Sequence, residues 1–138
     1  MPNPYFSFKQ FTVYHDRCAM KVGTDGVLLG AWCPVEHAVR VLDIGTGTGC
    51  IPISLKTNLP QANVSAIDIS EKALEVAKRN AVSNRVDISF IQADILEVED
   101  LSQYFDIIVS NPPYVRNLEK EEIKKNVLDY EPHLALFV

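Results

Sequence analysis

Residues 43–49 read DIGTGTG and directly follow RVL at 40–42, a pattern typical of the end of a buried strand. Glycines at alternate positions let the backbone turn sharply and approach a ligand where a Cβ would collide. Residues 50–58 (CIPISLKTN) then read as a helix, because a proline is tolerated in its first turn. The stretch therefore predicts a strand, a tight turn suited to a ligand, and a helix.

The same alternation continues along the chain. Strands are predicted at 63–68 (NVSAID), 88–94 (ISFIQAD) and 105–111 (FDIIVSN), and a helix at 71–84 begins after an N-cap at Ser70. Strands that alternate with helices predict an α/β fold with a Rossmann-like, mainly parallel sheet. Such a sheet binds ligands at the carboxyl ends of its strands, and every polar cluster described below follows one of these strands.

The two ends of the chain each predict one more helix. At the front, KVGTDGVLLGAW at 21–32 reads as a turn followed by a helix that Thr24 or Asp25 caps. Its buried side is expected to carry Val27, Leu28, Ala31 and Trp32. Near the other end, residues 118–132 (LEKEEIKKNVLDYEP) predict a charged helix with a solvated face.

Composition limits the class of protein. The 138 residues suffice for one domain, and 47% hydrophobic with 22% charged residues is ordinary for a globular protein. No apolar run approaches the ~18 residues of a membrane span, and the first residues lack the pattern of a signal peptide. The three cysteines are far apart with no CxxC pair, and the three histidines are scattered. We therefore expect a cytoplasmic protein with reduced thiols, no metal and no membrane contact.

Charge is unevenly distributed along the chain. Residues 1–40 carry four basic and three acidic side chains (net +1), whereas 41–138 carry nine and fifteen (net −6), which argues against a general nucleic-acid binder. An RNA contact would use the front segment, where Lys9, Arg17 and Lys21 lie among aromatic residues. These aromatics are Tyr5, Phe6, Phe8, Phe11 and Tyr14. We favour the alternative that they belong to the core or to an edge strand.

The residues around the glycines indicate a cationic ligand. A dinucleotide-binding G-x-G-x-x-G motif would need glycine at the position of Cys50, and Asp43 would repel a phosphate. S-adenosylmethionine carries a positive sulfonium and a positive ammonium group and has no phosphate. Asp68, 25 residues beyond Asp43, ends the second strand and could accept hydrogen bonds from both ribose hydroxyls. Asp94 ends the third strand and is either a contact to the adenine amino group or a turn residue.

Residues 109–115 read VSNPPYV and follow the fourth strand. Two prolines hold φ near about −65°, and Pro112 keeps Asn111 extended, so the segment is rigid. An amide or exocyclic amino nitrogen is a poor nucleophile because its lone pair is delocalised. The Asn111 side-chain oxygen and the Pro112 carbonyl could each accept an N–H from such a nitrogen, and Tyr114 could stack on the flat acceptor. The motif predicts group transfer to a planar nitrogen through orientation and electrostatics.

Together, DIGTGTG, AIDIS (66–70), QAD (92–94) and VSNPPY resemble the class I S-adenosylmethionine-dependent N-methyltransferases that carry an (N/D)PP(Y/F/W) motif. Residues 6–32 are similar to bacterial tRNA adenine-N6 methyltransferases of valine tRNA, and residues 41–138 resemble HemK-type methyltransferases, which methylate a glutamine of release factors. The resemblance implies a class I methyltransferase fold with a release factor or a tRNA as methyl acceptor. The implied cofactor-binding residues are Asp43, Gly45, Thr46, Gly47, Gly49, Asp68, Ile69 and Asp94. The implied catalytic residues are Asn111, Pro112, Pro113 and Tyr114.

In such enzymes the segment before the first strand folds over the methionine end of the cofactor. Lys21, Thr24 and Asp25 therefore become candidates for cofactor binding, the alternative being a plain capped helix. We expect one S-adenosylmethionine-binding domain over 1–138, in which 1–38 form a lid or helix segment and 39–138 form the βαβ core.

Two departures from the family pattern bear on function. We expect no counterpart of the helical domain with which HemK-type enzymes engage the release factor, and we expect the sheet to end after four strands where the class I fold normally has seven. FDIIVS at 105–110 would then be an exposed apolar edge, which predicts a homo-oligomer. The alternatives are a cofactor-binding fragment or hybrid without turnover and, less favoured, an NAD-dependent oxidoreductase, against which Cys50 and the NPPY motif argue.

Overall fold

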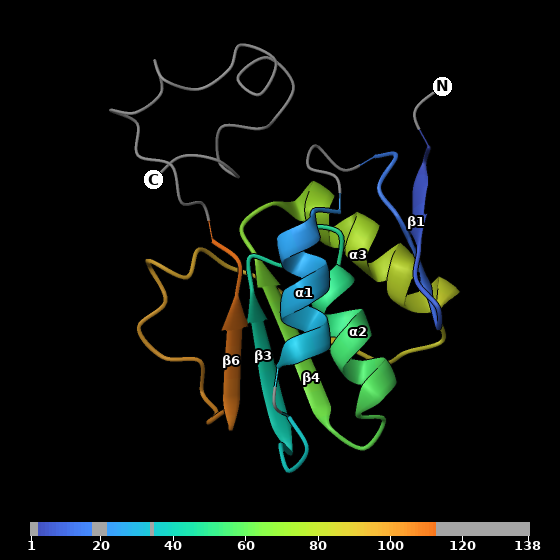
Figure 1. Ribbon diagram of the computed structural model, residues 1–138. Coiled ribbons are helices and arrows are strands. Elements are labelled where there is room, and N and C mark those ends of the chain that lie inside the picture. Colours follow the sequence, from blue (N-terminus) through green and yellow to red (C-terminus); the bar gives the residue numbers. More distant parts are fainter. Residues whose placement is uncertain (1–2, 18–21, 34, 113–138) are drawn as a thin grey trace, which may run out of the picture.

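The computed structural model describes residues 3–17, 22–33 and 35–112, which form a parallel sheet, three helices and a hairpin (Figure 1). The sheet has the order β5-β4-β3-β6, with all neighbours parallel. Its strands are β3 (Arg40–Ile44), β4 (Asn63–Asp68), β5 (Ser89–Gln92) and β6 (Ile107–Ser110). The predicted α/β fold with a Rossmann-like parallel sheet is therefore confirmed. The charged helix predicted at 118–132 lies outside the described residues.

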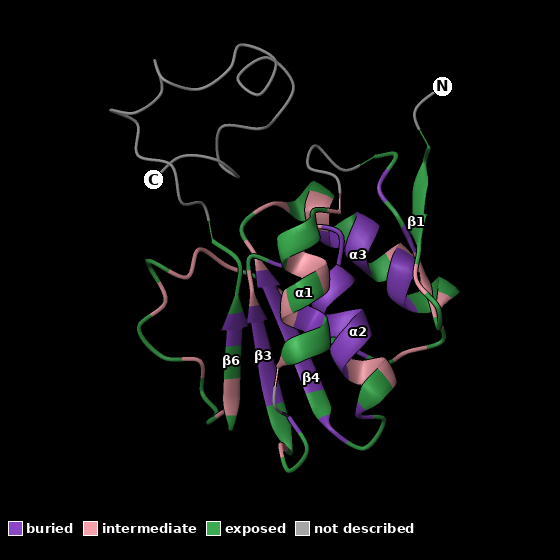
Figure 2. Cartoon of the chain, viewed as in Figure 1, coloured by how far each residue is buried: buried purple, intermediate pink, exposed green. Residues whose placement is uncertain are grey.

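The core forms where α2 (Cys50–Asn58) packs on the sheet. This helix contacts β3, β4 and both other helices, α1 (Thr24–Trp32) and α3 (Glu71–Ser83). Its apolar side chains are buried in one cluster with those of the central strands, as the purple helix face in Figure 2 shows. Ile53 and Val41 are both fully buried there. Burial of each such side chain contributes about 1.5–3 kcal/mol, so α2 anchors the loop that precedes it.

Helix α1 comes close to α2 at Gly30, and its Val27 and Leu29 are partly buried against the core. Gly30 is buried, and a Cβ built on it would lie 3.1 Å from the Cβ of Ser54 in α2. On the other side of the helix, Leu28 is 46% exposed and Trp32 is 80% exposed. The buried side predicted for α1 is therefore wrong, and of its four residues only Val27 is partly buried.

The predicted caps of the helices meet different outcomes. Gly23 is the N-cap of α1 and no side chain makes a capping bond there, so the prediction that Thr24 or Asp25 caps this helix is wrong. The Val27 N–H donates to the Gly23 carbonyl instead, at 3.3 Å. Ser70 does cap α3, because its hydroxyl oxygen accepts from the backbone N–H three residues on at 3.3 Å.

A two-stranded antiparallel hairpin, β1 (Tyr5–Ser7) and β2 (Thr12–Tyr14), lies against α3 (Figure 1). Val13 is fully buried in the core, and the rings of Phe8 and Phe11 stack at 4.2 Å between centroids and pack against it. Three aromatic side chains on the strands are 39–42% exposed: Tyr5, Phe6 and Tyr14. The favoured interpretation, core and edge-strand aromatics, is confirmed.

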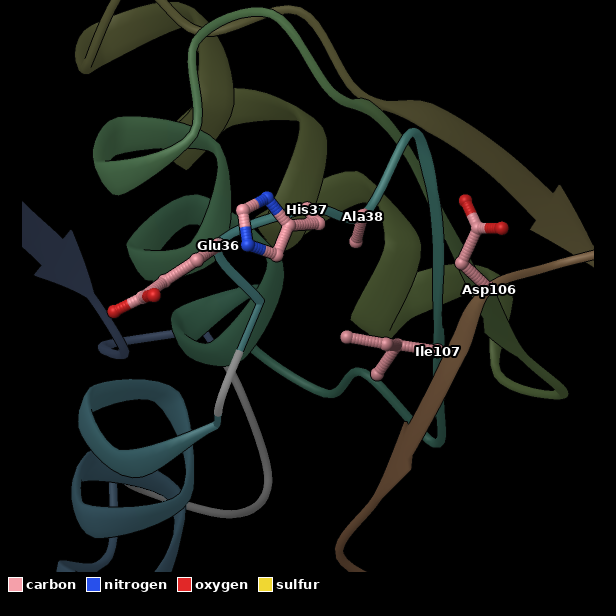
Figure 3. Close-up of a pocket in the computed structure, with 5 residues that line it drawn as sticks. All are labelled: Glu36, His37, Ala38, Asp106 and Ile107. Atoms are coloured by element: carbon pink, nitrogen blue, oxygen red, sulfur yellow. The ribbon is translucent and has the colours of Figure 1, made fainter.

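The amino ends of β3 and β6 are joined by Asp106. One carboxylate oxygen accepts from the backbone N–H groups of Val39 and Arg40, both at 2.8 Å. These two bonds hold the pKa of the Asp106 carboxyl below its ordinary value, although the side chain is exposed. A shallow hollow lies here, between Asp106, Ile107 and residues 36–38 (Figure 3). It sits at the opposite edge of the sheet from the glycine loop.

Gly49 forms the junction between the glycine loop and the helices. It is the N-cap of α2 with φ +80°, and a Cβ built on it would lie 3.1 Å from the Cβ and 3.2 Å from the Cα of Ala77 in α3. The Ala77 Cα belongs to the helix backbone, so it cannot move away as a flexible side chain would. Gly45 has a similar φ, +75°, but a Cβ there would meet no atom within 4 Å.

We predict that Gly45→Ala costs about 1–2 kcal/mol of unfolding free energy, the usual penalty for a left-handed alanine. Gly49→Ala should cost about 1–3 kcal/mol more, because the added methyl also overpacks the contact with α3. Urea unfolding followed by circular dichroism measures both variants beside the wild type. Equal losses in the two variants would show that the contact between Gly49 and Ala77 does not constrain the loop.

Candidate active site

The register of the sheet brings three chain segments together at one edge. Ile44 at the end of β3 pairs with Ile67 in β4 and with Ser110 in β6. The Ser110 hydroxyl also donates to the Ile44 carbonyl at 3.0 Å, which holds the ends of β3 and β6 together. Directly after these paired residues come the glycine loop, Asp68 and Asn111. The predicted cluster at the carboxyl ends of the strands is therefore present among the described residues.

The glycine loop is tied to the end of β4 by its backbone. The N–H groups of Gly45 and Thr46 both donate to the Ile67 carbonyl, at 2.8 and 3.1 Å. The Gly47 N–H donates to an oxygen of the Asp68 carboxylate at 2.8 Å. Gly45 and Gly47 have φ of +75° and +55°, and a Cβ on either would meet nothing within 4 Å. These two glycines serve the backbone turn, and the space in front of them is open to a ligand.

Asp68 is held in one orientation by two backbone groups. Its Oδ2 accepts from Gly47, and its Oδ1 accepts from the N–H of Ser70 at 2.9 Å. An ionised carboxylate has about four lone-pair sites, so each oxygen can still accept one bond from a ligand hydroxyl. The side chain is half-buried, and Ile69 beside it is 49% exposed. This arrangement offers a fixed double acceptor next to an apolar surface.

Asp94 lies just beyond β5 and is half-buried. One of its carboxylate oxygens accepts from the backbone N–H of Leu96 at 3.0 Å, which is the geometry of an Asx turn. The turn alternative stated for this residue is therefore present, and it leaves the second carboxylate oxygen for another contact.

Asp43 is a buried acid in the middle of the site. It is 0% exposed, and neither carboxylate oxygen has a hydrogen-bond partner. Burial raises the pKa of the Asp43 carboxyl to about 7, and the nearby Asp68 carboxylate adds to the rise. The neighbouring Thr46 hydroxyl opposes this rise, although its buried oxygen is not in hydrogen-bonding geometry. Because the side chain has no exposed surface, it would act on a ligand through its negative potential, which favours a cation over a phosphate.

Cys50 follows the loop and is buried next to Asp43. Burial and the Asp43 charge raise the pKa of its thiol to about 12, so it is not a nucleophile at neutral pH. Cys33 is also free. Within the described ranges no group of three or more His, Cys, Asp or Glu residues could hold a metal ion.

The remaining predicted site residues are only partly described. Asn111 and Pro112 follow β6 and are exposed at the edge that carries the glycine loop. Thr24 and Asp25 are exposed in the first turn of α1. This end of the helix lies toward the same edge of the sheet (Figure 1). Lys21, Pro113 and Tyr114 lie outside the described residues.

Two buried or half-buried amides near the site were not predicted. Asn80 and Asn84 of α3 hydrogen-bond to β2, and Asn80 also reaches the Thr48 carbonyl of the glycine loop at 2.9 Å. The signal in the sequence is their spacing. They continue the inward-facing positions of Ala73 and Ala77, where an apolar residue would be expected.

The family model described as "Methyltransferase small domain" matches residues 18–132. The chain belongs to the methyltransferase small domain family. The resemblance to class I methyltransferases inferred from the motifs is thereby confirmed.

Two curated relatives match different methyltransferases. The chain is 71% identical over 100 residues to the release factor glutamine methyltransferase of Flavobacterium psychrophilum, covering 72% of this chain and 35% of that protein. It is 53% identical over 117 residues to the tRNA1(Val) (adenine(37)-N6)-methyltransferase of Bacteroides thetaiotaomicron, covering 83% of this chain and 49% of that protein. The chain thus spans less than half the length of either relative.

Among solved structures, the fold is similar to the Pyrococcus abyssi tRNA (uracil-54, C5)-methyltransferase in complex with S-adenosyl-L-homocysteine. The TM-score is 0.63 at 25% sequence identity, over 81% of this chain and 29% of that chain. In the part of this chain that the structure describes, no helix has the length and hydropathy needed to cross a membrane.

We predict that Asp43 makes the unliganded protein less stable as pH rises. Because its folded pKa is about 7 against an ordinary 3.8, its contribution is fully present below pH 3.8 and is lost as pH rises through 7. Each unit of such a shift corresponds to about 1.4 kcal/mol. Asp43→Asn cannot titrate, so its stability relative to the wild type should rise between pH 5 and pH 8. Urea unfolding at several pH values measures this, and two parallel stability curves would contradict it.

Proposed function

We propose that this chain is the cofactor-binding and catalytic part of an S-adenosylmethionine-dependent N-methyltransferase. The observation that carries the proposal is the register of β3, β4 and β6, which places the glycine loop between Asp68 and Asn111. Membership of the methyltransferase family and relatives named as N-methylating enzymes support it.

The residues at this edge fit such a cofactor. When bound, S-adenosylmethionine supplies a methyl group on a positively charged sulfur. Asp68 would accept from the ribose hydroxyls with the lone pairs that its two backbone bonds leave free. Gly45 and Gly47 leave space for the ligand, and the Asp43 carboxylate provides negative potential although it is too buried for direct contact.

Other predicted contacts are part of the same proposal. Ile69, half exposed next to Asp68, would contact the adenine ring, and Asp94 would accept from its amino group with the oxygen not used in the turn. Thr46 and Gly49 complete the loop. Lys21, Thr24 and Asp25 remain candidates for the methionine end, within a front segment over 1–38 that we propose acts as a lid on the 39–138 core.

Asn111 would prepare the methyl acceptor. An amide or exocyclic amino nitrogen donates both of its N–H groups to fixed acceptors, and we assign these to the Asn111 side-chain oxygen and the Pro112 carbonyl. Holding both hydrogens favours pyramidal geometry at the nitrogen and directs its lone pair. The Ser110 hydroxyl bond to the Ile44 carbonyl fixes the chain immediately before Asn111. Pro113 and Tyr114 would continue this rigid segment and stack on the flat acceptor.

Two acceptors fit this chemistry equally well: a glutamine side chain of a release factor and N6 of a tRNA adenine. The higher identity favours the first, and the longer matched share of this chain favours the second. A cytoplasmic location is part of the same proposal, because release factors and tRNA act in the cytoplasm. A cofactor-binding unit without turnover is the competing proposal, since the chain spans less than half of each relative.

We predict that calorimetric titration with S-adenosylmethionine shows saturable binding that Asp68→Ala weakens at least about tenfold, because charge-assisted hydrogen bonds are lost. Asn111→Ala should bind within about twofold of the wild type but lose transfer of labelled methyl to release factor or tRNA. Asp100→Ala is the control, since this exposed acid bonds only a local amide.

The outcomes separate the alternatives. Binding and transfer that both survive in the two variants would show that the site is misplaced. Binding without transfer to either acceptor would support the unit without turnover. A folded protein that binds no cofactor would contradict the proposal that the chain is part of an enzyme.

We also propose that the chain pairs with a second copy through β6. Among the described strands β6 is an edge, and Ile108 on it is 59% exposed. Light scattering at micromolar concentration should then give twice the chain mass, and Ile108→Lys should shift the species toward monomer. A monomeric wild type under these conditions would contradict the pairing.

A further inference from the structure

Two asparagines of α3 take the place of a third strand beside the hairpin. In β2 the backbone groups of Thr12 and Tyr14 point away from β1. Asn84 accepts from the Thr12 N–H at 2.9 Å and donates to the Thr12 carbonyl at 2.6 Å. Asn80 does the same for Tyr14, at 2.8 and 2.7 Å. Each side-chain amide thus imitates the N–H and C=O pair of a neighbouring strand.

The two asparagines differ in their remaining bond. Asn80 donates its second hydrogen to the Thr48 carbonyl in the glycine loop at 2.9 Å. Asn84 donates its second hydrogen to the Asn80 carbonyl at 2.7 Å, within its own helix. Asn80 is fully buried, and its backbone partners determine which end of the amide is oxygen. Only Asn80 therefore joins the hairpin and the loop.

The place of this bond in the loop matters for a ligand. Thr48 lies between Gly47, whose N–H donates to Asp68, and Gly49, where a Cβ would lie 3.1 Å from the Cβ of Ala77 in α3. The Asn80 bond adds a further restraint to this short turn, and this one comes from α3. A change at Asn80 is therefore transmitted to the loop while the Asp68 side chain itself is untouched.

We infer that Asn80 is a positioning residue for the cofactor, which couples the docking of the β1–β2 hairpin to the conformation of the glycine loop. The inference rests on the proposed cofactor site. The Asn80 amide has two linked tasks. Its oxygen and one N–H hold the Tyr14 backbone, and its second N–H holds the Thr48 carbonyl. Because such coupling is reciprocal, cofactor binding should in turn stabilise the hairpin at Tyr14.

The test uses two matched variants of the full chain, Asn80→Asp and Asn84→Asp. Each keeps the acceptor oxygen, removes two donors, one of them to the hairpin, and adds one negative charge to the same helix. Only Asn80→Asp faces the loop carbonyl with a carboxylate. Calorimetric affinity for S-adenosylhomocysteine should fall about tenfold in Asn80→Asp and change less than about twofold in Asn84→Asp. The melting temperature should fall in both.

A second measurement needs no substitution and so remains decisive if a variant does not fold. Saturating wild-type protein with S-adenosylhomocysteine should slow amide hydrogen exchange at Tyr14 more than at Thr12, as measured by NMR. The Tyr14 N–H is bonded to Asn80, whereas the Thr12 N–H is bonded to Asn84.

Each result counts for or against the inference. Equal losses of affinity in the two variants, or equal protection at the two amides, would reduce Asn80 to a structural residue and overturn the inference while the proposed function stands. If wild-type protein binds no S-adenosylhomocysteine, the proposed function fails first and the inference fails with it.

Discussion

The hydrogen bonds between the glycine loop and the end of β4 are the constraint on which the site depends. Two loop N–H groups share the Ile67 carbonyl, and a third is held by Asp68, so the loop cannot move without breaking the end of a central strand. Asp68 thereby has two tasks, since it shapes the loop and presents acceptors at its rim. Loss of its carboxylate would therefore change the loop as well as the proposed contact to the ligand.

The glycines of the chain serve two different needs. Gly45 and Gly47 are required for their left-handed backbone and leave free space, which is what a ligand site demands. At Gly49 and Gly30 another helix leaves little room for a Cβ, and Gly49 has left-handed backbone as well. A sequence motif of repeated glycines therefore mixes ligand access with helix packing, and only the contacts distinguish them.

Much of the fold could be predicted because its signals are local. The strands that end at Ile44, Asp68 and Ser110 are short apolar runs followed at once by polar or glycine residues, and the cap at Ser70 is a local hydrogen bond. The exposure of Leu28 and Trp32 on α1 could not be predicted, because the helix meets α2 at Gly30, a residue that carries no hydrophobic signal. The hydrogen bonds of Asn80 and Asn84 to β2 could not be predicted either, because they join residues 66 and 72 positions apart.

The outward orientation of α1 has a practical consequence for spectroscopy. The chain has one tryptophan, and Trp32 is 80% exposed at the end of this helix. An indole already in water changes its surroundings little when the core comes apart, so its fluorescence is a poor reporter of unfolding. The same indole is well placed to signal anything that covers the helix: a shift of its emission toward the blue on adding a binding molecule would locate that molecule on α1.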